Sequence, residues 1–143
     1  MENELTVYAA GLFDGEGSVG VYRKNRGKYI RHDLHVSMKM TDLLPLRYLM
    51  AHFGGSISTP KIVGNRKQSY TWQVSAIKAV RFLEKIYSYL KVKQVGAVLA
   101  IQFYRNLISS SNRLTALSPE MRQARDIIAN EFKKINRRGK YVE

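Results

Sequence analysis

The spacing of apolar residues in the first third of the chain predicts a helix followed by a two-stranded hairpin. Residues 3–14 place apolar side chains every three or four positions, and Asn3 is suited to cap such a helix. Residues 18–24 and 34–40 instead alternate between apolar and polar positions, and the basic segment 25–31 between them is expected to turn. The hairpin would therefore have one apolar face and one polar, basic face.

The same order of elements is predicted again in the residues that follow. A helix over residues 41–52 precedes a second hairpin with strands 56–62 and 69–75, and further helices cover residues 76–89 and 94–106. We therefore expect an α+β fold of order αββαββα with a C-terminal helical extension. Its four-stranded antiparallel sheet would be saddle-shaped, with all helices on one face.

The length and composition favour one domain. We expect residues 1–143 to form a single unit, with a core over 1–108 and a linker over 109–117 that begins with three Ser. Residues 118–143 would then supply a last helix and a basic tail.

The first helix carries two distinct stripes. One stripe is large and is predicted to face the core: Leu5, Tyr8, Ala9, Leu12 and Phe13. The other consists mainly of small residues: Val7, Ala10, Gly11 and Asp14. Small residues let two helix backbones approach closely, so the second stripe fits either a partner helix or tight packing within the same domain.

The charge changes the picture of the polar sheet face. Lys and Arg number 24 against 11 Asp and Glu, a net charge of +13, which favours a polyanionic partner. Nucleic acid is the first candidate and an anionic membrane surface the second, but no basic amphipathic helix supports a membrane role. The chain has no Cys, no long apolar run and no signal-peptide pattern. We expect a soluble intracellular protein, cytoplasmic or organellar.

Two acids stand where a helix is expected to end. Residues 14–17 read DGEG, and Gly15 and Gly17 are predicted to stop the helix beside Asp14 and Glu16. Carboxylates are disfavoured at a helix C-terminus, which carries partial negative charge. A bound cation would remove this objection, because hard cations such as Mg²⁺ take oxygen ligands.

Residues 9–17, AAGLFDGEG, resemble the LAGLIDADG motif of the homing endonucleases. The later segments LHVSMKMTD and YLKVKQVGAVLAIQFYRNL are similar in type and order to single-motif members, so the resemblance covers most of residues 4–108. It implies a site-specific, intron-encoded DNA endonuclease. Such an enzyme would cut a long pseudo-palindromic double-stranded site by phosphodiester hydrolysis that depends on Mg²⁺ or Mn²⁺.

The resemblance also implies roles for individual residues. Glu16 and the carbonyl of Gly15 would bind the metal, although the family usually has aspartate at the position of Glu16. Lys93 would lie near the scissile phosphate. Asp42 matches a position near the metal-bound water network, and it is equally suited to cap a helix. Asp14 matches the other acid of the motif, which shapes the helix end.

The chain contains one copy of the motif, whereas the family builds its sites where two motif helices meet. The resemblance therefore implies a homodimer through Val7, Ala10, Gly11 and Asp14. The outward hairpin positions and the basic tail are the candidates for DNA contact: Ser18, Tyr22, Lys24, Arg26, Lys28, Arg31, Asp33, His35, Ser37, Lys39, Lys61, Arg66, Thr71, Gln73, Arg137, Arg138 and Lys140. For any one of them the alternative is a solubilising surface residue.

A second class of function remains open. A relative with this fold could bind nucleic acid without cutting it, as an intron RNA maturase or a transcription regulator, so intron RNA is a further candidate partner. Glu16 separates the two readings, because a non-cutting relative has little need of it. Its presence together with Lys93 favours cutting.

Overall fold

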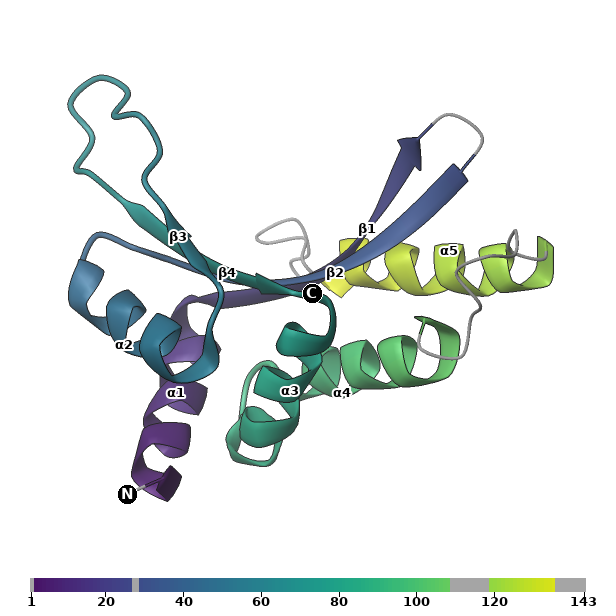
Figure 1. Cartoon of the computed structure of the whole chain (residues 1–143), viewed down its shortest axis with the longest axis horizontal. Coiled ribbons are helices and arrows are strands. Elements are labelled where there is room, and N and C mark those ends of the chain that lie inside the picture. Colours follow the sequence, from purple (N-terminus) through teal and green to yellow (C-terminus); the bar gives the residue numbers. More distant parts are fainter. Residues whose placement is uncertain (1, 27–28, 109–118, 136–143) are drawn as a thin grey trace, which may run out of the picture.

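The computed structural model describes residues 2–26, 29–108 and 119–135. Each predicted hairpin is present and follows a helix (Figure 1). The elements in chain order are α1 (Glu2–Glu16), β1 (Gly17–Arg26), β2 (Tyr29–Met40), α2 (Leu43–Phe53), β3 (Ser56–Ser58), β4 (Tyr70–Ser75), α3 (Ala76–Ile86), the short turn η1 (Tyr87–Tyr89), α4 (Gln94–Phe103), η2 (Tyr104–Ile108) and α5 (Pro119–Ile135).

The strands form one antiparallel sheet in the order β1-β2-β4-β3. Figure 1 shows the helices on one side of this sheet, which curves away from them at both ends. The predicted α+β architecture with a four-stranded saddle is therefore confirmed. The opposite, concave face carries no helix in the part of the chain that the structure describes.

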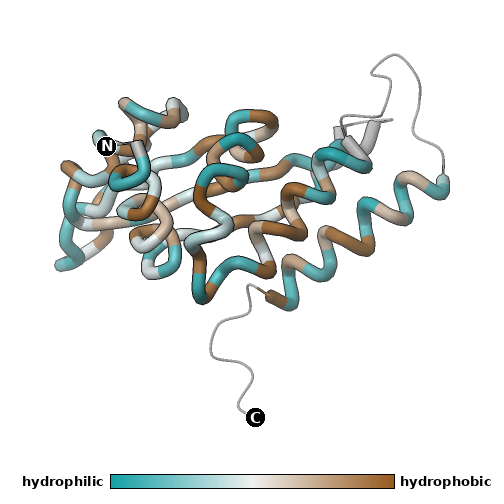
Figure 2. Tube along the Cα trace, turned by 90° about the horizontal axis from the view of Figure 1, so that it is seen from below, coloured by the Kyte–Doolittle hydropathy of each residue, from teal (hydrophilic) through white to brown (hydrophobic). Residues whose placement is uncertain are grey.

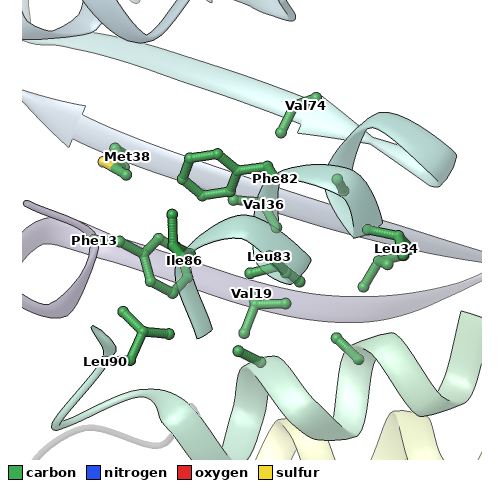
Figure 3. Close-up of a cluster of buried hydrophobic side chains, with 14 of the residues drawn as sticks. Phe13, Val19, Leu34, Val36, Met38, Val74, Phe82, Leu83, Ile86 and Leu90 are labelled. Atoms are coloured by element: carbon green, nitrogen blue, oxygen red, sulfur yellow. The ribbon is translucent and has the colours of Figure 1, made fainter. Parts of the chain in front are cut away.

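The core lies between the sheet and the helices (Figure 3). The ring of Phe82 on α3 contacts Phe13, Trp72 and Phe53, with centroids 5.9, 5.1 and 4.9 Å away. Most of the apolar positions of the alternating strands are buried, namely Val19, Val21, Leu34, Val36, Met38, Trp72 and Val74, and Met40 and Tyr70 at the strand ends are half-buried. The alternation of the sequence therefore set the register correctly, because a slip of one residue would turn every apolar side chain outward.

Several element ends differ from the prediction. α1 continues through Gly15 and ends at Glu16, two residues later than expected, and β1 begins at Gly17. A Cβ atom at Gly17 would lie 2.2 Å from Cδ2 of Phe13, so the chain turns where only glycine fits beneath that ring. The first hairpin turn is shorter than predicted, since its strands reach Arg26 and Tyr29.

The strands of the second hairpin are shorter than predicted, and so are α3 and α4. β3 ends at Ser58, just before Pro60, which has no N–H group to donate to a sheet. α3 gives way to η1 after Ile86, and α4 gives way to η2 after Phe103.

The C-terminal helix α5 docks on the rest of the fold. Figure 2 shows α4 and α5 running side by side, and α5 also contacts β1. Ala129 and Phe132 are buried in this contact, as is Arg125, whose pKa burial lowers. The linker 109–117 and the basic tail lie outside the described residues. Among the helices described, none has the length and apolarity needed to cross a membrane.

Candidate functional site

The buried face of α1 lies between the two predicted stripes. Ala9, Ala10 and Phe13 are fully buried, whereas Tyr8 is 47% exposed. The prediction that Tyr8 belongs to the core is therefore wrong. The reason is that α3 and the sheet cover the arc formed by positions 9, 10 and 13, and Tyr8 lies at the edge of the predicted stripe that is farther from this arc. Ala10 is 1% exposed in its own chain, and its place in a dimer interface stays a prediction.

Three members of the small stripe remain at the surface in whole or in part. Val7 is 49% exposed, and Gly11 is exposed with open space where a Cβ atom would lie. Asp14 is half-buried at the end of the stripe. This edge of α1 therefore has room for another helix.

Asp14 fastens the end of α1 to the loop before α4. Its carboxylate accepts the backbone N–H groups of Lys91, Val92 and Lys93 at 2.7, 3.1 and 3.0 Å. Burial would raise the pKa of the Asp14 carboxyl, but these hydrogen bonds and the charge of Lys93 lower it below its ordinary value of 3.8. Asp14 is thus a structural acid, held ionised by its surroundings.

Lys93 places a cation on the C-terminus of α1. It is the N-cap residue of α4, and its Nζ donates to the carbonyl oxygens of Phe13, at 3.2 Å, and Gly17. The same ammonium group lies 5.8 Å from the centroid of the Phe13 ring. A cation here complements the negative end of the helix dipole. The structure therefore explains one of the two acids at this helix end: Asp14 holds the loop that supplies Lys93.

Glu16 is the second acid, and it is exposed as the last residue of α1. Lys93 contacts the backbone on both sides of it, at Phe13 and Gly17. The carbonyl groups of the last helical turn, including that of Gly15, have no partner within the helix itself. A carboxylate and carbonyl oxygens are the donors that Mg²⁺ prefers, so these residues fit such an ion.

One chain supplies few ligands to such an ion. Across the described ranges, no group of three or more His, Cys, Asp or Glu side chains could hold a metal. Asp14 directs both its oxygens to backbone N–H groups, which leaves Glu16 as the acid of this helix end that faces solvent. A complete coordination shell therefore requires oxygens from elsewhere, such as water, phosphate or a second chain.

Asp42 lies at the start of α2. Its carboxylate accepts the backbone N–H of Leu44 at 3.2 Å, in the extended conformation of an N-cap. The capping role is thus confirmed, and the catalytic role stays a prediction.

The polar face of the sheet holds most of the candidates for nucleic-acid contact. Its strand pairs bring the hydroxyl groups of Ser18 and Ser37 to 3.0 Å and the rings of Tyr22 and His35 to 5.7 Å. Arg31 pairs with Asp33 at 2.7 Å. Further along this face and on the second hairpin, the exposed or half-exposed candidates are Lys39, Lys61, Arg66, Thr71 and Gln73.

Other candidates are not placed by the structure. For Lys24 and Arg26 the structure describes only the backbone, which is part of β1. The remaining candidates lie outside the described residues: Lys28, Arg137, Arg138 and Lys140.

The sequence did not predict two features of the molecule. A shallow cavity of about 260 Å³ on the polar face is lined by Lys78, together with His35 and Gln73. Lys78 belongs to α3, so strand alternation gave no sign that it would reach this face. On the helix side, the carboxylate of Asp126 contacts His32 and Arg23, which are separated from it by 94 and 103 positions.

Comparison with known proteins finds solved structures with a similar fold. No family model matches the sequence, and no curated protein matches it. Among solved structures, the archaeal intron-encoded homing endonuclease I-Vdi141I, complexed with DNA, has a TM-score of 0.80 at 21% identity, covering 99% of this chain and 91% of that one. The homing endonuclease I-CvuI, in complex with its target in the presence of Ca, has a TM-score of 0.78 at 17% identity, covering 99% and 88%.

A third solved structure differs in length. The LAGLIDADG homing endonuclease I-GzeII, in complex with a DNA target, has a TM-score of 0.58 at 18% identity. The match covers 91% of this chain and 43% of that chain. The resemblance seen in residues 9–17 therefore extends to the whole fold: this chain has the architecture of the LAGLIDADG homing endonucleases.

Proposed function

We propose that this chain is a site-specific endonuclease of double-stranded DNA, which acts as a homodimer and hydrolyses phosphodiester bonds with Mg²⁺ or Mn²⁺. The observation that carries the proposal is the end of α1. There Glu16, which is exposed, lies in the chain between Phe13 and Gly17, whose carbonyl oxygens accept hydrogen bonds from the Lys93 ammonium group. An anionic group for a metal and a cation for a phosphate thus belong to the same helix end.

The charge and shape of the sheet support DNA as the substrate. The net charge of +13 favours a polyanion, and the concave face is free of described helices. A two-stranded ribbon fits the major groove of DNA, and this sheet has a hairpin on each side. I-Vdi141I and I-GzeII, which share the fold, are complexed with DNA.

In this proposal Glu16 and the Gly15 carbonyl would hold the divalent cation. When bound, the cation supplies activation of water and neutralisation of phosphate charge. Lys93 would donate to a non-bridging phosphate oxygen, where negative charge develops as the bond breaks. Asp14 would keep Lys93 in place through the loop N–H groups and would not contact the DNA.

The homodimer would join two such sites along α1. Val7 and Gly11 leave an exposed edge beside Asp14, with no side chain on Gly11 to hold a partner helix away. The match to I-GzeII spans less than half of that chain, a length ratio expected if two copies of this chain do the work of one longer protein. Two-fold symmetry predicts a pseudo-palindromic site.

Selection from a randomised, palindrome-biased library of duplex DNA tests the proposal. The library is incubated with the wild-type protein in Mg²⁺ or in EDTA, and both cut and bound molecules are sequenced. We expect cut molecules only with Mg²⁺, all sharing one long, near-palindromic site. Bound but uncut DNA in both conditions would contradict the nuclease and favour a binding or splicing role, and RNA fragments of intron type would then be the next ligand to test.

A further inference from the structure

The outer half of the β1–β2 hairpin extends beyond the four-stranded sheet. β4 pairs with residues 35–40 of β2, so the part of β2 before His35 pairs with β1 alone. In Figure 1 this two-stranded arm rises on the far side of the sheet from β3. Isolated two-stranded ribbons are marginally stable in water, so the arm needs support from another element.

Helix α5 supplies that support from the helix side of the sheet. It runs beneath β1 in Figure 1 and contacts this strand directly. Asp126 of α5 accepts one hydrogen bond from Arg23 of β1, at 3.0 Å, and a second from His32 of β2, at 2.9 Å. Each carboxylate oxygen therefore holds a different strand of the arm.

The two contacts differ in burial. The His32 side chain is fully buried, whereas that of Arg23 is 44% exposed. A carboxylate can only accept, so Nε2 of His32 carries the shared proton. No other hydrogen bond satisfies the second ring nitrogen of His32 within the described residues. Removal of Asp126 would leave a buried imidazole without a partner, which is costly, while exposed Arg23 would regain water.

The two strands of the arm carry candidate DNA contacts on their opposite face. Arg23 is directly opposite His32, and the neighbouring pair on the other face is Tyr22 opposite Asp33. Successive residues of a strand point to opposite faces, so fixing one pair fixes the other. The contact with α5 therefore also determines where Tyr22 and the Arg31–Asp33 ion pair lie on the polar face.

We propose that Asp126 is a positioning residue for DNA specificity, and this proposal rests on the proposed function. By joining Arg23 to His32, it holds the arm in the shape that presents Tyr22 and Arg31 to the outer base pairs of each half-site. The arm is directed away from α1, where the proposed two-fold axis lies, and therefore reaches base pairs far from the centre (Figure 1). The cutting centre at Glu16 does not depend on it.

Asp126→Ala tests this role, with Glu131→Ala as the matched control. Glu131 is an acid of the same helix whose ion pair, to Lys134, stays within α5. Backbone hydrogen exchange of the arm is measured without DNA. Affinity is then measured for the site recovered by the selection and for versions of it substituted at outer or central base pairs. Asp126→Asn, which keeps one acceptor oxygen, serves if the alanine variant does not fold.

The expected result is specific to the arm. Amides of the arm exchange about tenfold faster in Asp126→Ala, while those of α1 and α3 are unchanged. An outer substitution costs the wild type about tenfold in affinity, the usual range for one base pair, and costs Asp126→Ala almost nothing. Central substitutions cost both proteins the same, and Glu131→Ala behaves as the wild type.

Two results would overturn the proposal. One is unchanged exchange in the arm of Asp126→Ala, and the other is faster exchange with outer discrimination intact. Failure of the proposed function looks different: either the wild-type protein binds DNA without cutting it in Mg²⁺, which leaves the affinity test of Asp126 intact, or it binds no DNA at all. In the second case the role in specificity fails as well, while the exchange result alone decides whether Asp126 holds the arm.

Discussion

The carboxylate of Asp14 accepts the backbone N–H of Lys93 at 3.0 Å, and the ammonium group of Lys93 returns to the carbonyl of Phe13 at 3.2 Å. The two residues thus close a ring between the end of α1 and the start of α4. Through this ring a cation is fixed beside Glu16, although 77 positions separate Lys93 from that acid. The roles of these residues can be tested through stability, cleavage rate, oligomeric state and DNA affinity.

The first prediction concerns stability and pH. Because the folded-state pKa of Asp14 lies below 3.8, the unfolded chain takes up the proton first as the pH falls. Asp14 therefore stabilises the fold above about pH 4, and the benefit is lost as the pH falls through the folded pKa. Asp14→Asn should lower the free energy of unfolding by about 1–2 kcal/mol at neutral pH.

Urea unfolding from about pH 7 down to about pH 2.5 measures this difference, which should shrink at the acid end. Glu131→Gln, which removes an exposed acid of α5, is the control and should change the free energy of unfolding at neutral pH by less than about 0.5 kcal/mol. A constant difference between wild type and Asp14→Asn at all pH values would show that the carboxylate charge is not what matters.

The second prediction concerns Lys93. Lys93→Met should slow cleavage of the recovered site about 10²–10³-fold, the usual loss for one group that stabilises developing charge. DNA affinity should stay within a few-fold, because many phosphate contacts remain. Lys91→Met is the control, since Lys91 is exposed and gives Asp14 only its backbone N–H. Equal cleavage rates for the two variants would show that Lys93 has no role in cleavage.

The third prediction concerns the dimer. A Cβ atom at Gly11 would meet no other atom within 4 Å, so Gly11→Leu should be tolerated by a single chain. It should even stabilise the helix by about 0.5–1 kcal/mol, because glycine is a poor helix former. Sedimentation should nevertheless show a monomer in place of a dimer, with cleavage lost. Asn130→Leu, at an exposed position of α5, should remain dimeric. A dimeric Gly11→Leu protein would place the interface elsewhere.

The fourth prediction concerns the salt dependence of DNA binding. Each phosphate contact contributes about −0.9 to the slope of log affinity against log salt. Lys39→Ala, on the polar sheet face, should therefore make the slope shallower by about 1. Arg81→Ala, on α3, changes the net charge equally but should leave the slope unchanged. If both variants change the slope alike, the polar sheet face is not the DNA surface.

The sequence was most informative where one face of an element is buried. Leu34, Val36 and Met38 alternate with polar residues, and all three are buried as predicted. The period of a strand is two, so the pattern leaves little choice of face. A helix leaves more choice of face. The predicted stripe and the buried face share Ala9 and Phe13, and the neighbouring elements bury Ala10 instead of Tyr8.

Contacts between distant segments could not be read from the chain. The sequence indicated that Asp14 is unusual for its place, but the donors come from the loop before α4. Asp126 gave no signal at all, because a single acid on a predicted helix is ordinarily solvated. Its partners His32 and Arg23 are on strands whose pairing must be known before the contact can be inferred.

Single-turnover cleavage of the recovered site by wild type and Glu16→Gln is the most direct measurement of the central claim. Both proteins are bound to the DNA at equal occupancy before Mg²⁺ is added. We predict rapid cutting of both strands by the wild type, none in EDTA, and no detectable cutting by Glu16→Gln despite unchanged binding. Cleavage by Glu16→Gln at the wild-type rate would show that the end of α1 is not the active site.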